Sequence, residues 1–323
     1  MKINTRSHSS STNVARSVLL TLLLGISGFF ALPAAARQLD APDLIQSFAV
    51  GPEPWGLASD GANLWVTSLD SNSVTKLRES DGAPLGTFPA GGGTIFAAFD
   101  GVYIWVTNYY VNTVTRLRAS DGTMQGTFPV GPGPTGILFD GANIWVANQN
   151  NNTVSKLLAS DGTLLGTFTA GGRNPIDFAF DGANIWVTNF TSDTVSKLQA
   201  SDGTLLGTFP VGAGATGIVF DGANIWVASD GSNTVTKLQD SDGALLGTRR
   251  VGSVSRELAF DGANVWVTNS GSNSVMQLGL NHGAILHIYA VDSYPVGILF
   301  DGANIWVANY VNNTVNKISR TQP

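Results

Sequence analysis

The chain has 323 residues, with 17 lysines and arginines against 23 aspartates and glutamates, so its formal net charge is −6. Only 12% of the residues are charged, whereas 38 are glycine, more than the ~7% usual in globular proteins. This composition excludes a disordered, highly charged chain, and the absence of cysteine excludes disulfides, thiolate metal sites and a thiol nucleophile. It favours a compact all-β domain rich in turns.

Residues 1–36 predict a secretory signal peptide. They contain three basic and no acidic residues, the apolar-rich stretch 18–32 follows the basic start, and Ala34 and Ala36 form an A-x-A cleavage site. The apolar stretch is shorter than the ~20 residues that span a bilayer, so an uncleaved membrane anchor is the weaker alternative. We therefore expect an exported protein, periplasmic or secreted, with no membrane insertion after cleavage.

Cleavage after Ala36 would remove three positive charges and take the formal net charge from −6 to −9. A surface this acidic repels phosphate backbones, and no cluster of lysines and arginines interleaved with aromatic residues compensates for it. Nucleic acid is therefore not expected as a partner.

A motif of about 40 residues recurs to the end of the chain, and each copy has an Asp-Gly pair with a tryptophan five residues after the aspartate. The aspartates are Asp60, Asp100, Asp140, Asp181, Asp221, Asp261 and Asp301, at spacings of 40 or 41 residues. A period of this length with strand-like content is typical of a β-propeller blade. The sequence predicts an all-β, seven-bladed β-propeller with four-stranded blades.

The third repeat predicts strands a to d at Thr135–Phe139, Asn143–Ala147, Thr153–Leu158 and Leu164–Ala170. An Asp-Gly pair, a strong hairpin signal, lies between strands a and b and another between c and d. Strands a and b are apolar on both faces, which fits sheets packed between neighbouring sheets. We expect the repeated tryptophan to fill much of the contact between blades.

The two ends of the domain predict how the ring closes. The last repeat ends after its strand c at Thr314–Ser319, whereas residues 44–50 resemble a strand d. We therefore expect the N-terminal strand to complete the last blade, which hides both sheet edges. The predicted domain is 44–323, joined to the signal peptide by a short linker at 37–43.

Strand order places both Asp-Gly turns of each repeat on one face of the ring, the bottom face. The b–c loops and the d–a connections lie on the opposite, top face. Among the seven copies the bottom turns barely vary, while the top loops differ in nearly every blade, which favours a binding site on the top face over drift of an unconstrained surface. The candidate binding residues are Glu53, Trp55, Phe96, Tyr109, Tyr110, Arg173, Asp177, Phe190, Arg256, Glu257, Tyr294 and Tyr310.

Aromatic residues beside amides and a few charges are typical of surfaces that bind a carbohydrate, a peptide or a protein. Trp55 is the only tryptophan outside the repeat register, and it is the strongest candidate together with Arg256. Arg249 and Arg250 replace the usual Phe-Pro of an outer strand, where charges that protect a sheet edge are the expected explanation and an adhesive patch is the alternative.

The pattern Trp-Val-Thr-Asn…Asn-Thr-Val-Ser-Lys-Leu, with Gly-Pro-Gly-Pro-Thr-Gly before the next copy, resembles the YVTN family of β-propeller repeats, with Trp where that family usually has Tyr. The resemblance covers 44–319. The chain is more loosely similar to NHL-type propellers and to the virginiamycin B lyases. Propellers of these families have varied functions, so the resemblance implies architecture and export more than activity.

The sequence contains few residues that are suited to catalysis. The repeated aspartates are interpreted as turn residues, because no copy has the alternating oxygen ligands of a cation loop. The lyase resemblance implies a histidine, glutamates and a divalent cation near the channel mouth. However, His282 is predicted on a bottom turn and His287 on an outer strand, which leaves only Glu53 and Glu257 at the mouth. No catalytic residue, metal ligand or cofactor is predicted.

We therefore expect a monomeric, non-catalytic binding module that holds a protein, peptide or carbohydrate ligand on its top face. The alternative is a lyase or hydrolase that uses Glu53, Glu257 and Arg256 at the channel mouth. A purely structural protein of the cell envelope is the third possibility.

Overall fold

The computed structural model describes residues 37–38 and 44–319. The predicted signal peptide, 1–36, lies outside the described residues, as do 39–43 of the predicted linker and 320–323. The described part of the chain contains no helix that is long and apolar enough to cross a membrane.

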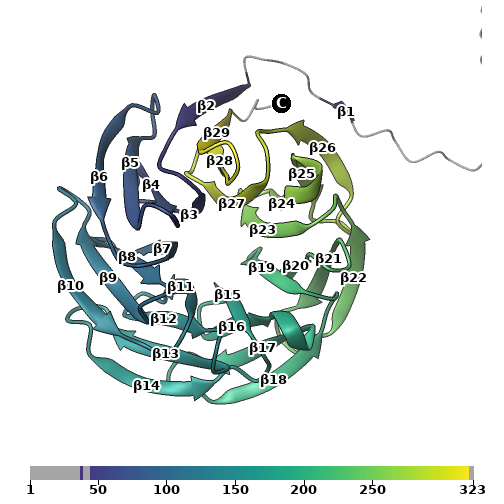
Figure 1. Cartoon of the computed structure of the whole chain (residues 1–323). Coiled ribbons are helices and arrows are strands. Elements are labelled where there is room, and N and C mark those ends of the chain that lie inside the picture. The colour runs from purple at the N-terminus through teal and green to yellow at the C-terminus, as the bar shows by residue number, and fades with distance from the viewer. Residues whose placement is uncertain (1–36, 39–43, 320–323) are drawn as a thin grey trace, which may run out of the picture. The chain divides into compact units, whose positions relative to one another are not determined.

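Residues 44–319 form seven four-stranded antiparallel sheets around a central axis, which confirms the predicted seven-bladed β-propeller (Figure 1). Blades one to four consist of β3 (Pro54–Ser59), β4 (Asn63–Ser68), β5 (Ser73–Arg78) and β6 (Pro84–Pro89); β7 (Thr94–Phe99), β8 (Tyr103–Asn108), β9 (Thr113–Arg118) and β10 (Met124–Pro129); β11 (Pro134–Phe139), β12 (Asn143–Asn148), β13 (Thr153–Leu158) and β14 (Leu164–Thr169); and β15 (Pro175–Phe180), β16 (Asn184–Asn189), β17 (Thr194–Gln199) and β18 (Leu205–Pro210). Blades five to seven consist of β19 (Ala215–Phe220), β20 (Asn224–Ser229), β21 (Thr234–Gln239) and β22 (Leu245–Arg250); β23 (Ser255–Phe260), β24 (Asn264–Asn269), β25 (Ser274–Gly279) and β26 (Ile285–Ala290); and β27 (Pro295–Phe300), β28 (Asn304–Asn309), β29 (Thr314–Ser319) and β2 (Ile45–Ala49). The bounds predicted for the third repeat differ from these by one residue at most.

The N-terminal strand closes the ring, as predicted. β2 pairs antiparallel with β29, so that Ile45 lies opposite Ile318 and Phe48 opposite Val315. The segment expected to be a linker contributes one further element. Its residues 37–38 form β1 (Arg37–Gln38), which pairs in parallel with β26 and adds a fifth strand to blade six.

Each blade contains the same hydrogen bond between its buried tryptophan and the aspartate of its a–b turn. In the third blade Trp145 Nε1–H donates to Asp140 Oδ2 at 2.7 Å, and the equivalent distances in the other six blades are 2.6–2.9 Å. Asp140 also accepts the backbone N–H groups of Ala142 and Asn143 and the side-chain amide of Asn143. Burial raises the pKa of Asp140, but these hydrogen bonds outweigh it and hold the pKa below its ordinary value.

A cation from strand c lies over the tryptophan ring and reaches the next blade. Lys76 Nζ is 4.8 Å from the Trp65 ring centre and donates to the carbonyl of Ala119 in blade two at 2.7 Å. A lysine does the same in blades three, four, five and seven, and Arg116 takes this place in blade two. Lys317 of blade seven donates to the carbonyl of Glu79 in blade one at 2.7 Å, which continues the series across the closure of the ring.

In six blades an aromatic ring from the outer strand also packs against the tryptophan. In blade two the centres of Phe128 and Trp105 are 5.3 Å apart, and Phe128 also packs on Gly162 in the c–d turn of blade three. Gly162 has a φ of +81°, and a Cβ there would lie 2.0 Å from the Phe128 ring, so this turn requires glycine. In blade five Arg249 replaces the phenylalanine, and its Nε–H donates to the Gly283 carbonyl of blade six at 3.0 Å. Arg249 therefore joins two blades, a role that sequence analysis missed.

Ring closure predicts slow amide hydrogen exchange in β2. The N–H groups of residues 45–49 that pair with β29 should exchange on the timescale of those in β6, the outer strand of the neighbouring blade, because both bond to a buried strand c. Hydrogen exchange with mass spectrometry measures this. Exchange of residues 45–49 at the rate of an unstructured peptide would contradict the closure.

Asp140→Ala should lower the free energy of unfolding by about 2–3 kcal/mol, because it leaves the indole N–H and the turn amides without their acceptor. Urea unfolding measures the loss. Asp161→Ala is the matched control, since Asp161 lies in the exposed c–d turn of the same blade and bonds to Thr163. Equal shifts of the unfolding midpoint in the two variants would contradict the role assigned to the tryptophan–aspartate bond.

Candidate functional site

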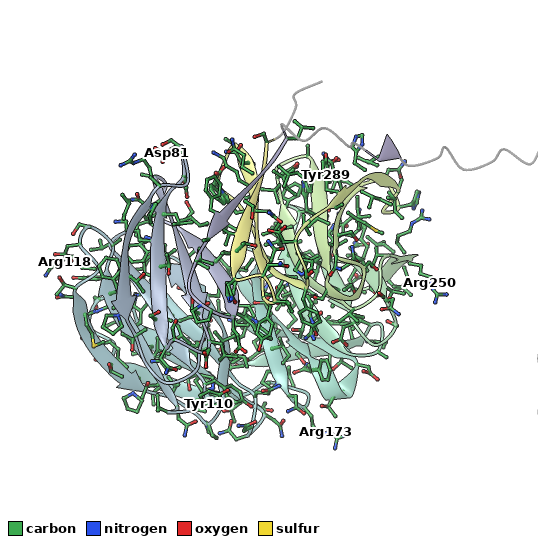
Figure 2. The ribbon with its side chains drawn as sticks, turned by 45° about the horizontal axis from the view of Figure 1, so that its top comes forward. Asp81, Tyr110, Arg118, Arg173, Arg250 and Tyr289 are labelled. Carbon is green, nitrogen blue, oxygen red and sulfur yellow. The ribbon has the colours of Figure 1, made fainter. Side chains whose placement is uncertain are left out.

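The top face lies at the end of the ring opposite the c–d turns. Figure 2 shows Asp81, in a c–d turn, at one end of the molecule, and Tyr110 and Arg173, in top-face loops, at the other. This arrangement follows from the alternating directions of the four strands in each blade.

A pocket of about 310 Å³ lies on the top face at the axis of the ring. The start of the innermost strand of every blade contributes to its lining, with Trp55, Ile95, Thr135, Ile176, Thr216, Arg256 and Val296 in equivalent positions. Leu69, Phe96, Tyr109, Tyr110, Gln149, Phe190 and Glu257 complete the lining. Seven of the twelve candidate residues therefore meet in one pocket, although they come from four different blades.

Two carboxyl groups meet beside this pocket. Asp177 is the third residue of β15 in blade four and Glu257 is the third residue of β23 in blade six, and their side chains form a hydrogen bond. Gly217 of blade five lies between them, and a Cβ there would lie 2.7 Å from Glu257 Oε2. The pair can form because Gly217 leaves this space empty. Asp177 Oδ2 also accepts the Ile218 backbone N–H at 3.3 Å.

A hydrogen bond between two carboxyl groups needs a proton. Burial raises the pKa of Asp177 to about 6, and burial together with the charge of Asp177 raises the pKa of Glu257 well above its ordinary value. Arg256 opposes the shift of Glu257 without reversing it. At neutral pH the pair therefore retains one proton and has one negative charge.

Arg256 is paired within the protein. Its Nη1 lies 3.7 Å from Asp230 Oδ2, and its Nη2 donates to the Tyr294 hydroxyl at 3.1 Å. Burial raises the pKa of Asp230, and the charge of Arg256 opposes this effect. The positive charge of Arg256 is thus matched by Asp230 and is not left uncompensated beside the pocket.

Tyr294, Tyr310 and Glu53 support the pocket wall from outside its lining. Trp55 lies edge-on against Tyr310 with ring centres 5.7 Å apart, and Tyr310 lies 5.9 Å from Tyr294. Burial and a hydrogen bond from Tyr310 to Glu53 raise the tyrosine's pKa to about 12. The three residues therefore help to fix the position of Trp55.

The remaining candidates differ in their surroundings. Tyr109 and Tyr110 lie edge to face with centres 5.7 Å apart, and Phe190 begins the short 3₁₀ helix η1 (Phe190–Ser192). The side chain of Arg173 is exposed at the edge of the top face and does not line the pocket (Figure 2). Glu53 and Glu257, which the catalytic alternative uses together, have different partners, because Glu53 bonds to Tyr310 and Glu257 to Asp177.

Sequence analysis named Asp177 and Glu257 but missed their contact, and it missed Asp230 as the partner of Arg256. A signal for the first was present in the repeats. Asp177 and Glu257 occupy the same position of strand a, where the blade between them has Gly217. Comparison of this one column would have placed both carboxyl groups at the same height beside the axis, with a glycine between them.

Nothing in the described residues groups three or more histidine, cysteine, aspartate or glutamate side chains in a way that could hold a metal ion. His282 lies in the c–d turn of blade six and His287 in β26, the outer strand of that blade. Both residues are therefore remote from the start of the inner strands that form the pocket.

Comparison with solved structures identifies propellers of similar size. A virginiamycin B lyase from Staphylococcus aureus matches with a TM-score of 0.75 and 20% identity over 86% of this chain and 99% of the other. Hydrazine synthase from Kuenenia stuttgartiensis matches with a TM-score of 0.76 and 17% identity over 84% and 96%, and U3-55K with 0.75 and 13% over 86% and 99%. No protein-family model and no curated protein matches the chain. At these identities the similarity shows the fold alone.

The carboxyl pair should make stability depend on pH. The pKa of Asp177 is raised from 3.8 to about 6, so its contribution to stability is fully present below pH 3.8 and is lost as the pH rises through 6. In the variant Asp177→Asn with Glu257→Gln both side chains are amides, which do not titrate, so this pH-dependent loss of stability is absent. Relative to the wild type, this variant should therefore gain about 2–3 kcal/mol of stability between pH 4 and pH 7.

Urea unfolding at several pH values measures this difference. The control is Asp202→Asn, in an exposed c–d turn. The pKa of Asp202 lies below its ordinary value, so this variant should show no such gain. Parallel stability curves for the wild type and the double variant from pH 4 to pH 7 would contradict the assignment.

Proposed function

We propose that this protein is an exported, monomeric binding module that recognises a peptide, protein or carbohydrate ligand through the top-face pocket. The observation on which the proposal rests is the pocket itself, to which every blade contributes and in which seven residues that depart from the repeat meet. Export is supported by the signal-like pattern of residues 1–36. The repeat pattern supports classification with the YVTN-type propellers.

The lining of the pocket is suited to recognition. Its volume of about 310 Å³ lies at the lower end of the range for small-ligand sites. Five aromatic residues in the lining, Trp55, Phe96, Tyr109, Tyr110 and Phe190, offer large rigid surfaces that lose little conformational freedom on binding. Because a closed ring holds the loops in fixed positions, ordering them costs little when the ligand binds.

An enzyme is the second candidate, and the Asp177–Glu257 pair is the observation that favours it. A carboxyl group that keeps its proton at neutral pH beside a pocket is a suitable general acid, and such groups are common in active sites. The carboxyl partner of Glu257 in this version is Asp177, while Glu53 bonds to Tyr310. A thermal shift on addition of a divalent cation that disappears in Glu257→Gln would favour the enzyme.

The binding proposal predicts that top-face substitutions abolish recognition without changing the fold. The labelled wild-type protein, purified after export with its own N-terminus, is applied to peptide and glycan arrays beside the variant Trp55→Ser with Tyr109→Ser and Tyr110→Ser. Array ligands bound by the wild type should lose at least about 90% of their signal with the variant, because the removed rings supply most of the aromatic contact area. Circular dichroism confirms the fold.

The control replaces exposed bottom-side residues, Leu164→Ser with Leu165→Ser, and should leave array binding unchanged. Equal array signals for the wild type and the top-face variant would overturn the proposed site. A mass for the exported chain that corresponds to a start at Arg37 would support the export proposal, and an intact Met1 would contradict it.

A further inference from the structure

The ionisable groups beside the pocket leave one negative charge without a counter-ion. Arg256 is matched by Asp230, which lies 3.7 Å away and is partly buried. The Asp177–Glu257 pair has two carboxyl groups and, with its shared proton, one charge that no other cation in the described residues offsets by an ion pair. A buried charge of this kind is costly unless a partner of opposite sign approaches it.

The same pocket also has an aromatic lining. Trp55, Phe96, Tyr109, Tyr110 and Phe190 belong to the same lining as Glu257. The faces of aromatic rings attract cations, and the attraction is strongest where water is excluded. An anionic group in one pocket with several aromatic rings is the combination that recognises an organic ammonium ion.

The loops around the pocket would attract such a cation from solution. Within the described residues, the top-face loops contain the acids Glu53, Asp70, Asp193, Asp230 and Asp292, a single arginine, Arg173, and no lysine. Negative charge around a pocket raises the local concentration of cationic ligands and lowers that of anionic ones.

We propose that the pocket binds the alkylammonium group of its ligand, whose N–H groups donate to the Glu257 carboxyl of the Asp177–Glu257 pair while its methylene chain lies against the aromatic rings. This inference rests on the proposed binding function and names the ligand chemistry for the same site. A lysine side chain of a peptide and a free alkylamine share that chemistry.

Binding of the cation should expel the shared proton. An ammonium ion stabilises the second negative charge of the pair, so the proton leaves to the buffer as the ligand binds. Arg256 is the charged group that acts on the pair from within the protein, with Asp230 and Tyr294 as its own partners, and β19 between the two acids presents only Thr216 and Gly217 there. Near pH 7 we expect the release of up to one proton per bound ligand.

Isothermal titration calorimetry with the exported full-length protein tests the inference. The probes are Nα-acetyl-lysine methylamide and n-pentylamine, and the neutral comparators are the Nε-acetylated lysine derivative and 1-pentanol. The ammonium probes should bind at least about tenfold more tightly than their comparators. Titrations in phosphate and in MOPS, which differ in heat of ionisation and contain no primary ammonium group, count the released proton.

The variant Asp177→Asn with Glu257→Gln keeps the shapes of both side chains and should lose at least about tenfold in affinity for the ammonium probes, together with the proton release. Asp202→Asn on the bottom face is the matched control and should change neither. Binding of the lysine derivative alone would assign the ammonium group to a peptide, and binding of both probes would show that an alkylamine suffices.

Equal affinity for ammonium probes and neutral comparators would overturn the inference, as would no binding of either probe. The array experiment then reports separately on the proposed function. If the wild type still binds array ligands through its top face, the proposed binding function is supported and only the inference of an ammonium ligand is overturned. If the arrays show no top-face binding while the ammonium probes bind the pocket, the site binds a small amine, and the proposal of a peptide, protein or carbohydrate ligand is overturned.

Discussion

The hydrogen bond from each blade's tryptophan to the aspartate of its own a–b turn is the interaction on which the rest of the ring depends. It fixes the turn and the plane of the indole together, as Asp140 does with Trp145. In five blades the ring so placed is covered by a lysine that donates to a carbonyl of the next blade, as Lys76 does to Ala119, and in blade two Arg116 takes this place. One local hydrogen bond per blade thus positions the indole ring against which these contacts between blades are made.

These contacts lie in strands b and c, the outer strand and the bottom turns, so the start of the inner strand is free to vary. Glycine occupies the third position of strand a in blades one, three, five and seven, whereas blades two, four and six have Phe96, Asp177 and Glu257. The glycines give their bulky neighbours room near the axis, where a Cβ at Gly217 would lie only 2.6 Å from the Cα of Glu257. The departures from the repeat can therefore gather in a pocket without loss of the interactions that hold the ring.

The architecture could be predicted because the same sequence motif occurs seven times. Each Asp-Gly turn and tryptophan occurs at a constant spacing, and residues 44–50 match the strand that the last repeat lacks, so β2 could be paired with β29 before any coordinates. The site could be predicted only as a set of loop residues. The contact of Glu257 with Asp177 depends on the space left by Gly217, and the ion pair of Arg256 with Asp230 depends on side-chain directions. Arg249 was expected to protect an exposed sheet edge, whereas its side chain donates a hydrogen bond to blade six.

The propeller combines a uniform scaffold with a variable site, and the indole N–H signals of the eight tryptophans test this division most directly. In a ¹H–¹⁵N correlation spectrum, the seven blade tryptophans should show slow hydrogen exchange, because each N–H is buried against an aspartate. Trp55 lies outside this arrangement and lines the pocket, so its signal should exchange fast and should be the one that moves when Nα-acetyl-lysine methylamide is added. Fast exchange of several blade indoles, or shifts spread over all eight signals, would contradict the account.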